Sequence, residues 1–135
     1  MQLLLFAVNV RLNCKYMLSF ITEQFNVELV EGVFRQRLLI CCIKEALEKR
    51  GFKIKRCGDD LFVNNKKLSV SIATKSLTSV LIHTGVNILS EGAPITVSGL
   101  KSDLGLEDIQ EFAEEVMVNY SKEIEDIVLA STKVR

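Results

Sequence analysis

The sequence has few of the features that mark specialised classes of protein. Its 135 residues include one proline, one histidine and no tryptophan, and no apolar run approaches the roughly 20 residues that would span a bilayer. The 17 Lys and Arg residues balance 17 Asp and Glu residues, so the formal net charge is zero. This balance gives no electrostatic reason to expect nucleic acid as a partner. We therefore expect neither a membrane nor a nucleic-acid partner.

The cysteines also exclude common arrangements. Cys14, Cys41, Cys42 and Cys57 form no CxxC pair, and His83 alone cannot complete a standard zinc set, so we expect no metal site. Two of them lie in the apolar run "LLICCI", where cysteine behaves as a small buried residue. Reduced thiols, typical of a cytoplasmic protein, are favoured over a disulfide framework.

The length and the absence of a visible linker predict one domain over residues 1–135. Near the start, "LLLFAVNV" has the length of a signal-peptide core but lacks a basic flank and a cleavage site, so a buried strand is the better interpretation. "MLSFITEQF" at 17–25 alternates like a second strand. Residues 33–50 are rich in helix formers and end in two cations followed by Gly51, which predicts a helix end.

The middle of the chain predicts further strands, and the last third predicts a helix. "FKIKRC" reads as a short strand, residues 61–63 and 67–74 as a hairpin around Asn64-Asn65, and 76–85 as another strand closed by Gly85. Apolar residues recur at helical spacing from residue 107: Ile109, Phe112, Ala113, Val116, Tyr120, Ile124, Ile127 and Val128. Consecutive strands between two main helices predict an α+β fold with a mixed, mainly antiparallel sheet.

The second hairpin strand raises the question of a binding site. Lys67, Ser69, Ser71 and Ala73 alternate with bulkier residues, and a strand points successive side chains to opposite faces. We expect the bulky face, which includes Val70 and Ile72, to lie in the core. The face of small residues would then carry either a packed helix or a ligand, with the Lys67 ammonium suited to a carboxylate or phosphate.

Other polar residues have an ordinary structural interpretation beside a functional one. His83 in a strand is more often structural than catalytic, and Asn87 after Gly85 fits a turn as well as a site. Asp60, with Asp59, fits a turn better than a pair of catalytic carboxylates. Arg37 could reach an anion, although a surface salt bridge is the simpler interpretation. No glycine-rich phosphate loop is present.

The order of these segments resembles the biotin and lipoate protein ligases. The resemblance is carried by "CGDDLFVNNKKLSVSIAT" followed by "SVLIHTGVNIL", with Asp59-Asp60, Lys67-Leu68 and Gly85-Val86-Asn87 at the matching positions. An uncharacterised, largely archaeal family with the same ligase-like fold is more similar still, through "MLSFITEQF", "RQRLL", "LIHTGVNI" and "TKVR". The resemblance runs from about Val10 to the C-terminus and implies the biotin/lipoate ligase-like, class II synthetase-like architecture.

In the ligases, the lysine that matches Lys67 contacts the carboxyl group of the acid and the phosphate of the acyl-adenylate. The resemblance therefore implies Lys67 as an electrostatic clamp, His83 and Asn87 as lining residues, and Asp60 as the group that orients the hairpin or a metal-bound phosphate. It also implies ATP with magnesium as the cofactor. Two features depart from the ligases. Val70 stands where they have glycine, and their arginine- and glycine-rich adenylate loop has no counterpart, so the domain is expected to be N-terminally truncated.

Two kinds of function follow from these observations. In the first, the chain is a ligase or acyltransferase relative that binds a small carboxylic acid or its acyl-adenylate, with Ser69, Ser71 and Arg37 close to the ligand. In the second, it is a non-catalytic module that retains the fold and forms a homodimer through an exposed sheet edge. An inactive fragment is a third interpretation. The sequence identifies neither the acid nor the acceptor.

Overall fold

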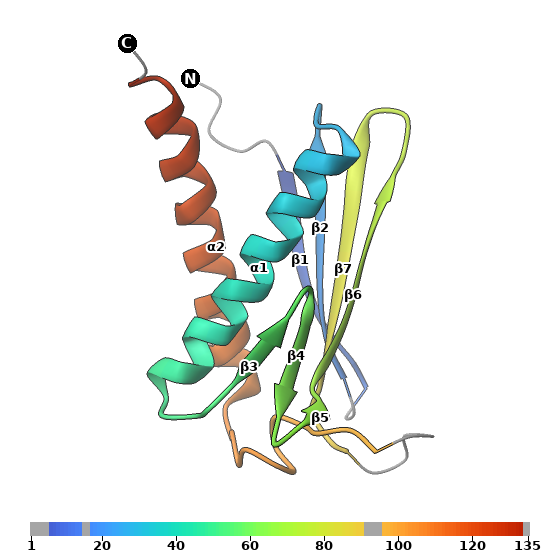
Figure 1. Ribbon diagram of the computed structural model, residues 1–135, viewed down its shortest axis with the longest axis vertical. Helices are drawn as coiled ribbons and strands as arrows, with labels where there is room; N and C mark the ends of the chain where they lie inside the picture. Colours follow the sequence, from blue (N-terminus) through green and yellow to red (C-terminus); the bar gives the residue numbers. More distant parts are fainter. Residues whose placement is uncertain (1–5, 15–16, 91–95, 134–135) are drawn as a thin grey trace.

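The computed structural model describes residues 6–14, 17–90 and 96–133. These residues form two helices and seven strands, in an order that confirms the α+β class (Figure 1). The elements are β1 Phe6–Cys14, β2 Met17–Phe25, α1 Leu29–Lys49, β3 Lys55–Cys57, β4 Asp60–Val63, β5 Lys66–Lys67, β6 Ser69–Lys75, β7 Ser79–Asn87 and α2 Ile109–Ser131. The strand predicted over residues 3–10 is present from Phe6 onward, and residues 3–5 lie outside the described residues.

The strands form two small sheets. Four strands pair antiparallel in the order β1-β2-β7-β6, and three pair antiparallel in the order β3-β4-β5. Lys67 also forms an isolated parallel bridge with Val97. Both helices lie on the same face of the four-stranded sheet, and the three-stranded sheet lies beside the C-terminal half of α1 (Figure 1). The opposite face of the four-stranded sheet is therefore left without a helical layer in the described structure.

Helix α1 approaches the sheet closely. Gly32 in its first turn is buried, and a Cβ atom at this position would lie 2.5 Å from Cγ1 of Val80 on β7. Farther along, Leu39, Ile40, Ile43 and Leu47 are fully buried in the main hydrophobic cluster. The helix begins four residues earlier than residues 33–50 predict, and these four residues include the glycine that makes the contact possible.

Helix α2 confirms most of the predicted apolar face. Asp108 caps it by accepting a hydrogen bond from the Glu111 N–H at 2.9 Å, which satisfies one donor of the first turn. The buried residues are Phe112, Ala113, Val116, Tyr120 and Ile124. Beyond Ile124 the prediction is wrong, because Ile127 is 48% exposed and Val128 is only partly buried. The last turns of α2 therefore extend past the core.

The hairpin around Asn64-Asn65 is confirmed, with both asparagines at positive φ, 50° and 65°. The expected burial of the next strand is wrong. Val70 and Ile72 are 50% and 59% exposed, whereas Ser69 is fully buried. The reason is a change of sheet: Lys67 pairs with β4, Ser69 pairs with β7, and Leu68 between them is buried as well. Because Leu68 and Ser69 are both buried, the alternation of buried and exposed side chains shifts by one residue along the strand. The small side chains therefore face α1.

Strand β7 is also longer than expected. It continues through Gly85 to Asn87, because Gly85 pairs with Ser19 on β2 and with Val70 on β6. A Cβ atom at Gly85 would lie 2.7 Å from Sδ of Met17. The glycine therefore serves close side-chain packing inside the sheet, and it does not end the strand.

Truncating Phe112 should test whether the α2 face is buried. The ring is fully buried and lies 5.5 Å from the Arg50 guanidinium carbon, so Phe112→Ala should lower the free energy of unfolding by about 3–5 kcal/mol. Val118→Ala, at a half-exposed position of the same helix, is the matched control and should cost less than about 1 kcal/mol. Urea denaturation measures both, and equal losses would contradict the packing of α2.

The reactivity of the thiols should follow their burial. Cys57 is exposed, Cys41 is partly buried, and burial together with the nearby Glu45 and Glu123 carboxylates raises the pKa of Cys42 to about 12. Because the thiolate is the reactive form, a thiol reagent should modify Cys57 first and Cys42 only after unfolding. Mass spectrometry of a labelling time course measures this order. Rapid labelling of Cys42 in the native protein would contradict it.

Candidate functional site

Lys67 and Asp60 form an ion pair on one face of the small sheet. Lys67 pairs with Phe62 on β4, and Asp60 lies two residues before Phe62, so the three side chains share a face. The Lys67 Nζ atom lies 3.2 Å from Oδ1 of Asp60, and the two side chains are 37% and 33% exposed. A pair this exposed contributes little to stability, about 0–1 kcal/mol, so its ammonium group can also contact another anion.

The backbone of Lys67 is fixed by the segments around it. Its carbonyl oxygen accepts hydrogen bonds from the Ser98 N–H at 2.9 Å and from Nδ2 of Asn87 at 3.4 Å. The Asn87 N–H donates to the Leu68 carbonyl at 2.9 Å, and Oγ of Ser98 donates to the carbonyl of Lys66. Lys67 therefore projects from a rigid junction between the two sheets. Asp60 contacts the Lys67 ammonium and Asn87 contacts its backbone carbonyl, and a shared role of the three residues in binding stays a prediction.

Ser69 and Ser71 lie beneath α1. Oγ of Ser69 accepts a hydrogen bond from the Leu61 N–H, and Oγ of Ser71 accepts one from Nε2 of Gln36 at 2.8 Å and contacts the Thr84 hydroxyl at 2.7 Å. Of the two interpretations of the small-residue face, the structure shows the packed helix. A direct contact of Ser69 with a ligand stays a prediction, and its full burial leaves little access.

Gln36 is the site-proximal residue that sequence reasoning did not single out. Its Nε2 atom also lies 3.3 Å from Oδ2 of Asp59, so one buried amide joins α1 to β6 and to the turn before β4. The available signal was a glutamine inside an otherwise apolar helical run. Its neighbour Arg37 is exposed, has no ion-pair partner among the described residues, and extends toward Gly58.

His83 lies on the open face of the four-stranded sheet, away from the helices. It is exposed, pairs with Ile21 and Ile72 on the neighbouring strands, and its Nε2 atom lies 3.1 Å from Oγ of Ser19. A cavity of about 130 Å³ adjoins it, lined by Met17, Val70, Ser71, Ile72, His83 and Gly85. Met17, which lines this cavity, pairs with Asn87, and the Asn87 side chain contacts the Lys67 carbonyl.

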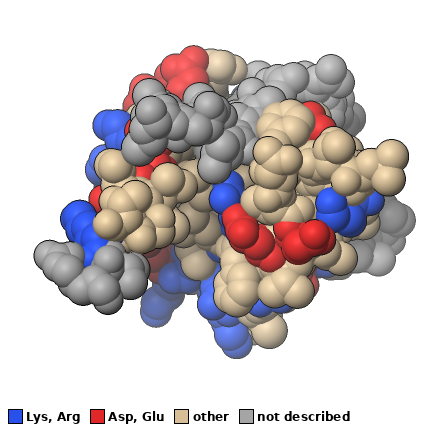
Figure 2. Space-filling model, turned by 90° about the horizontal axis from the view of Figure 1, so that it is seen from above, with Lys and Arg blue, Asp and Glu red and all other residues tan. Residues whose placement is uncertain are grey.

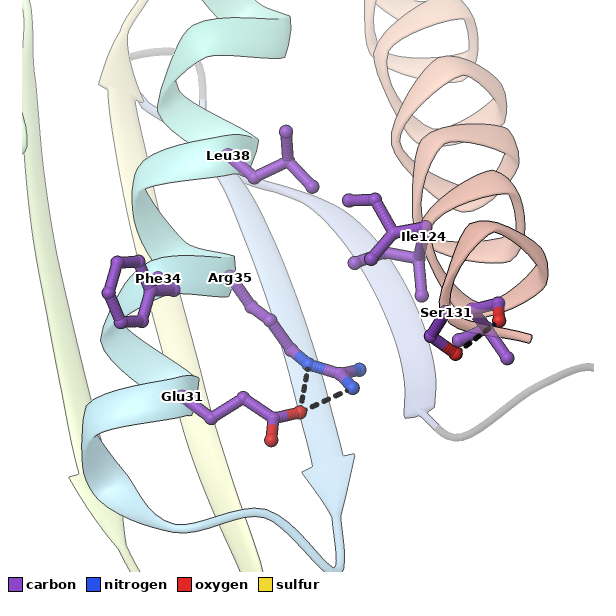
Figure 3. A pocket seen from close by; sticks show the side chains of 8 residues that line it. Glu31, Phe34, Arg35, Leu38, Ile124 and Ser131 are labelled. Atoms are coloured by element: carbon purple, nitrogen blue, oxygen red, sulfur yellow. Dashed lines mark hydrogen bonds and ion pairs between the residues drawn. The ribbon is translucent and has the colours of Figure 1, made fainter. Parts of the chain in front are cut away.

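A larger, mostly apolar cavity of about 620 Å³ lies where the start of α1 and the end of α2 diverge (Figure 3). Leu38 and Ile124 face each other across it, and Arg35 extends into it with Glu31 (Figure 3). The Arg35 Nη2 atom lies 2.6 Å from Oε2 of Glu31, and its Nη1 donates to Oε1 of Gln24 at 3.0 Å. Phe34 at its rim is 72% exposed.

A buried polar network closes the inner end of this cavity. Tyr120 donates to the Arg35 carbonyl at 3.1 Å, and Nε2 of Gln24 contacts the Tyr120 hydroxyl at 3.4 Å. Burial raises the pKa of Tyr120, so the phenol stays a hydrogen-bond donor at neutral pH.

Seen from above, from the end of the molecule where α1 begins, acidic side chains gather beside basic ones near the middle of the face (Figure 2).

No helix of the described residues is both long and apolar enough to cross a membrane. No group of three or more His, Cys, Asp or Glu side chains in residues 6–14, 17–90 and 96–133 is placed to hold a metal ion.

Comparisons with known proteins agree with this architecture. The sequence profile of a domain of unknown function, DUF366, matches residues 7–135. The uncharacterized protein MJ0805 of Methanocaldococcus jannaschii is 44% identical over 112 residues, which cover 82% of this chain and 50% of that protein. A solved protein of unknown function from Pyrococcus horikoshi has a TM-score of 0.79 at 35% identity, over 88% of this chain and 64% of its own. The chain thus spans about half the length of its curated relative.

Two solved ligases share the fold at low identity. A mutant biotin protein ligase from Aquifex aeolicus in complex with biotin has a TM-score of 0.68 at 19% identity, over 81% of this chain and 50% of its own. Another solved form of that ligase contains biotin and ATP. A putative lipoate protein ligase of Thermoplasma acidophilum with lipoic acid has a TM-score of 0.64 at 11% identity, over 80% and 51% of the two chains. These similarities confirm the biotin/lipoate ligase-like fold.

Proposed function

The chain belongs to the DUF366 family of domains of unknown function, and we propose that it binds a small carboxylic acid or its acyl-adenylate at the Lys67 junction. The single observation that carries the proposal is the Lys67–Asp60 pair. Its ammonium group is about one-third exposed and is held on a rigid strand end. In this proposal the function is ligation or acyl transfer, or a binding function derived from it.

The chemistry of the junction supports an anionic ligand. A carboxylate at the Lys67 ammonium would accept charge-assisted hydrogen bonds, which are stronger than neutral ones. Asp60 would keep the ammonium directed at the ligand, and the Asn87 amide fixes the backbone of Lys67. The apolar side chains of Met17, Val70 and Ile72 would contact the carbon chain of the acid. The biotin and lipoic acid in the ligases are carboxylic acids of this kind.

ATP is the cofactor that this proposal implies, and it would supply the adenylyl group when bound. The described residues offer a partial fit. Lys67 can hold one phosphate charge, and Asp60 is placed to orient a magnesium-bound phosphate. Arg37 extends toward Gly58, and among the described residues its guanidinium contacts neither Lys67 nor Asp60. The described residues therefore do not supply an arginine beside the Lys67 ammonium. Acid binding is therefore the part of the proposal best supported by this chain.

Replacing two neighbouring lysines should distinguish a clamp from a solvated charge. Lys67→Met should weaken the binding of octanoate, biotin, lipoate or their adenylates by roughly 10- to 150-fold, the effect of losing about 1.5–3 kcal/mol from one charge-assisted contact. Lys66→Met is the matched control. Lys66 is exposed and adjacent in sequence, so its side chain points to the opposite face and binding should be nearly unchanged.

Isothermal titration calorimetry at one fixed salt concentration measures both variants. Neither substitution should lower the free energy of unfolding by more than about 1 kcal/mol, because both side chains are at least partly exposed. Equal affinities of the two variants would reject the clamp. Failure of the unmodified chain to bind any of these acids or adenylates would reject the proposal itself.

A second candidate function is that of a non-catalytic module that forms a homodimer. We expect this module to act in the cytoplasm. The observation that favours it is the apolar open face of the sheet, where Val70, Ile72 and Leu81 are 50%, 59% and 42% exposed. Strand β6 is also the edge of that sheet, and an edge strand presents unpaired backbone groups.

Self-association through this face should depend on Ile72. Ile72→Lys should shift a dimer to a monomer in sedimentation equilibrium, because a charge would be buried in the apolar interface. Val118→Lys, at a half-exposed position of α2, is the control and should leave the mass unchanged. A monomer at all concentrations for the unmodified chain would reject this function.

A further inference from the structure

A third cavity, of about 610 Å³, lies beside the edge strand β3, and its lining is strongly basic. Four cations line it, Lys44, Lys53, Lys55 and Arg56, together with the ring of Phe62. No Asp or Glu is among its lining residues in the described structure. The whole chain has no net charge, so this cavity, which we call the basic pocket, is a local concentration of positive charge.

Most of this charge is not neutralised within the described residues. Lys44 is paired with Glu48 at 2.8 Å, and Arg56 donates to the carbonyl oxygen of Gly58 at 2.6 Å. Lys53 and Lys55 are exposed and have no ion-pair partner in the described part of the chain. Lys53, Lys55 and Arg56 therefore line one concave surface that has no carboxylate among its described lining residues, which favours a multiply charged anion there.

Phe62 separates this charge from the Lys67 junction. Lys55 and Lys67 both pair with Phe62, one from each side, so the three side chains form a row across the small sheet. Asp60 neutralises Lys67 at one end of the row, whereas Lys55 at the other end is unpaired among the described residues. The two lysines of this row are therefore suited to different partners.

The backbone gives the basic pocket a defined shape. Asn64 and Asn65, in the left-handed turn of the hairpin, line one side and add amide donors. The buried Ile54 and the partly buried Phe62 form its apolar part. The volume of this cavity is in the range of cavities that bind small molecules, so a small molecule is a better candidate ligand than a macromolecule.

We propose that the basic pocket binds the polyphosphate group of a small molecule through Lys53, Lys55 and Arg56, with Phe62 and Ile54 against the rest of that molecule. Lys53 and Lys55 have no ion-pair partner among the described residues, and Arg56 donates only to a neutral carbonyl, so the charge of these three side chains suits the several negative charges of a di- or triphosphate group. This site is separate from the carboxylate site at Lys67, and it does not rest on the proposed function.

Calorimetric titration with sodium tripolyphosphate, at one low salt concentration, tests the proposal. The double variant Lys53→Gln/Lys55→Gln should weaken binding by at least about tenfold, because two charge-assisted contacts are lost. The control is Lys101→Gln/Lys122→Gln, which removes the same net charge at two exposed positions that do not line the pocket and should change affinity by less than about twofold. Lys67→Met should retain tripolyphosphate binding.

Each outcome decides the matter. Equal weakening by the two double variants would show a general effect of net charge and would overturn the site, as would no binding by the unmodified chain. Loss of binding in Lys67→Met alone would place the phosphate at the Lys67 junction and would also overturn it.

A comparison of ADP with pyrophosphate identifies the source of the phosphate: tighter binding of ADP indicates a nucleotide, and equal binding indicates recognition of the phosphates alone. Either result supports the site.

Discussion

The close approach of α1 to the four-stranded sheet is the constraint on which the rest of the structure depends. Gly32 allows the helix backbone to reach Val80, since a Cβ atom there would lie only 2.5 Å from Cγ1 of that valine. Ser69 and Ser71 leave room beneath the helix farther along β6. Larger side chains at these positions would separate the two layers and open voids in a core that is otherwise closely packed.

This approach also decides where polar groups can lie. Gln36 is 4% exposed, and its amide is satisfied only because Ser71 and Asp59 come within hydrogen-bonding distance when α1 sits on the sheet. An unsatisfied buried amide would cost about 1–3 kcal/mol, so the same contact that packs the helix also anchors the turn before β4. Asp60, the next residue and the first of β4, is thereby placed where its carboxylate lies 3.2 Å from the Lys67 ammonium.

The two sheets meet at Leu68, and the chemistry of the junction follows from that meeting. The N–H of Leu68 donates to Leu61 in one sheet, and its carbonyl accepts from Asn87 in the other. Lys67 is consequently the last residue of one sheet, next to the open face of the other. A layer of helices on only one side leaves apolar residues exposed on that face, including Ile72 and Leu81. An exposed apolar surface of this kind commonly marks a binding or association site.

The sequence by itself determined the class of fold, the main helices and the Asn64-Asn65 hairpin. These features depend on local periodicity, on turn chemistry and on the resemblance to the ligases, all of which are visible along the chain. Only the tertiary structure decided that Ser69 faces α1 while Val70 and Ile72 are exposed, because the reversal at Leu68 arises from pairing with two different sheets. It likewise decided the partners of Gln36 and the grouping of Lys44 with Lys53 and Lys55, since these contacts join segments whose spacing in the sequence carries no periodic signal.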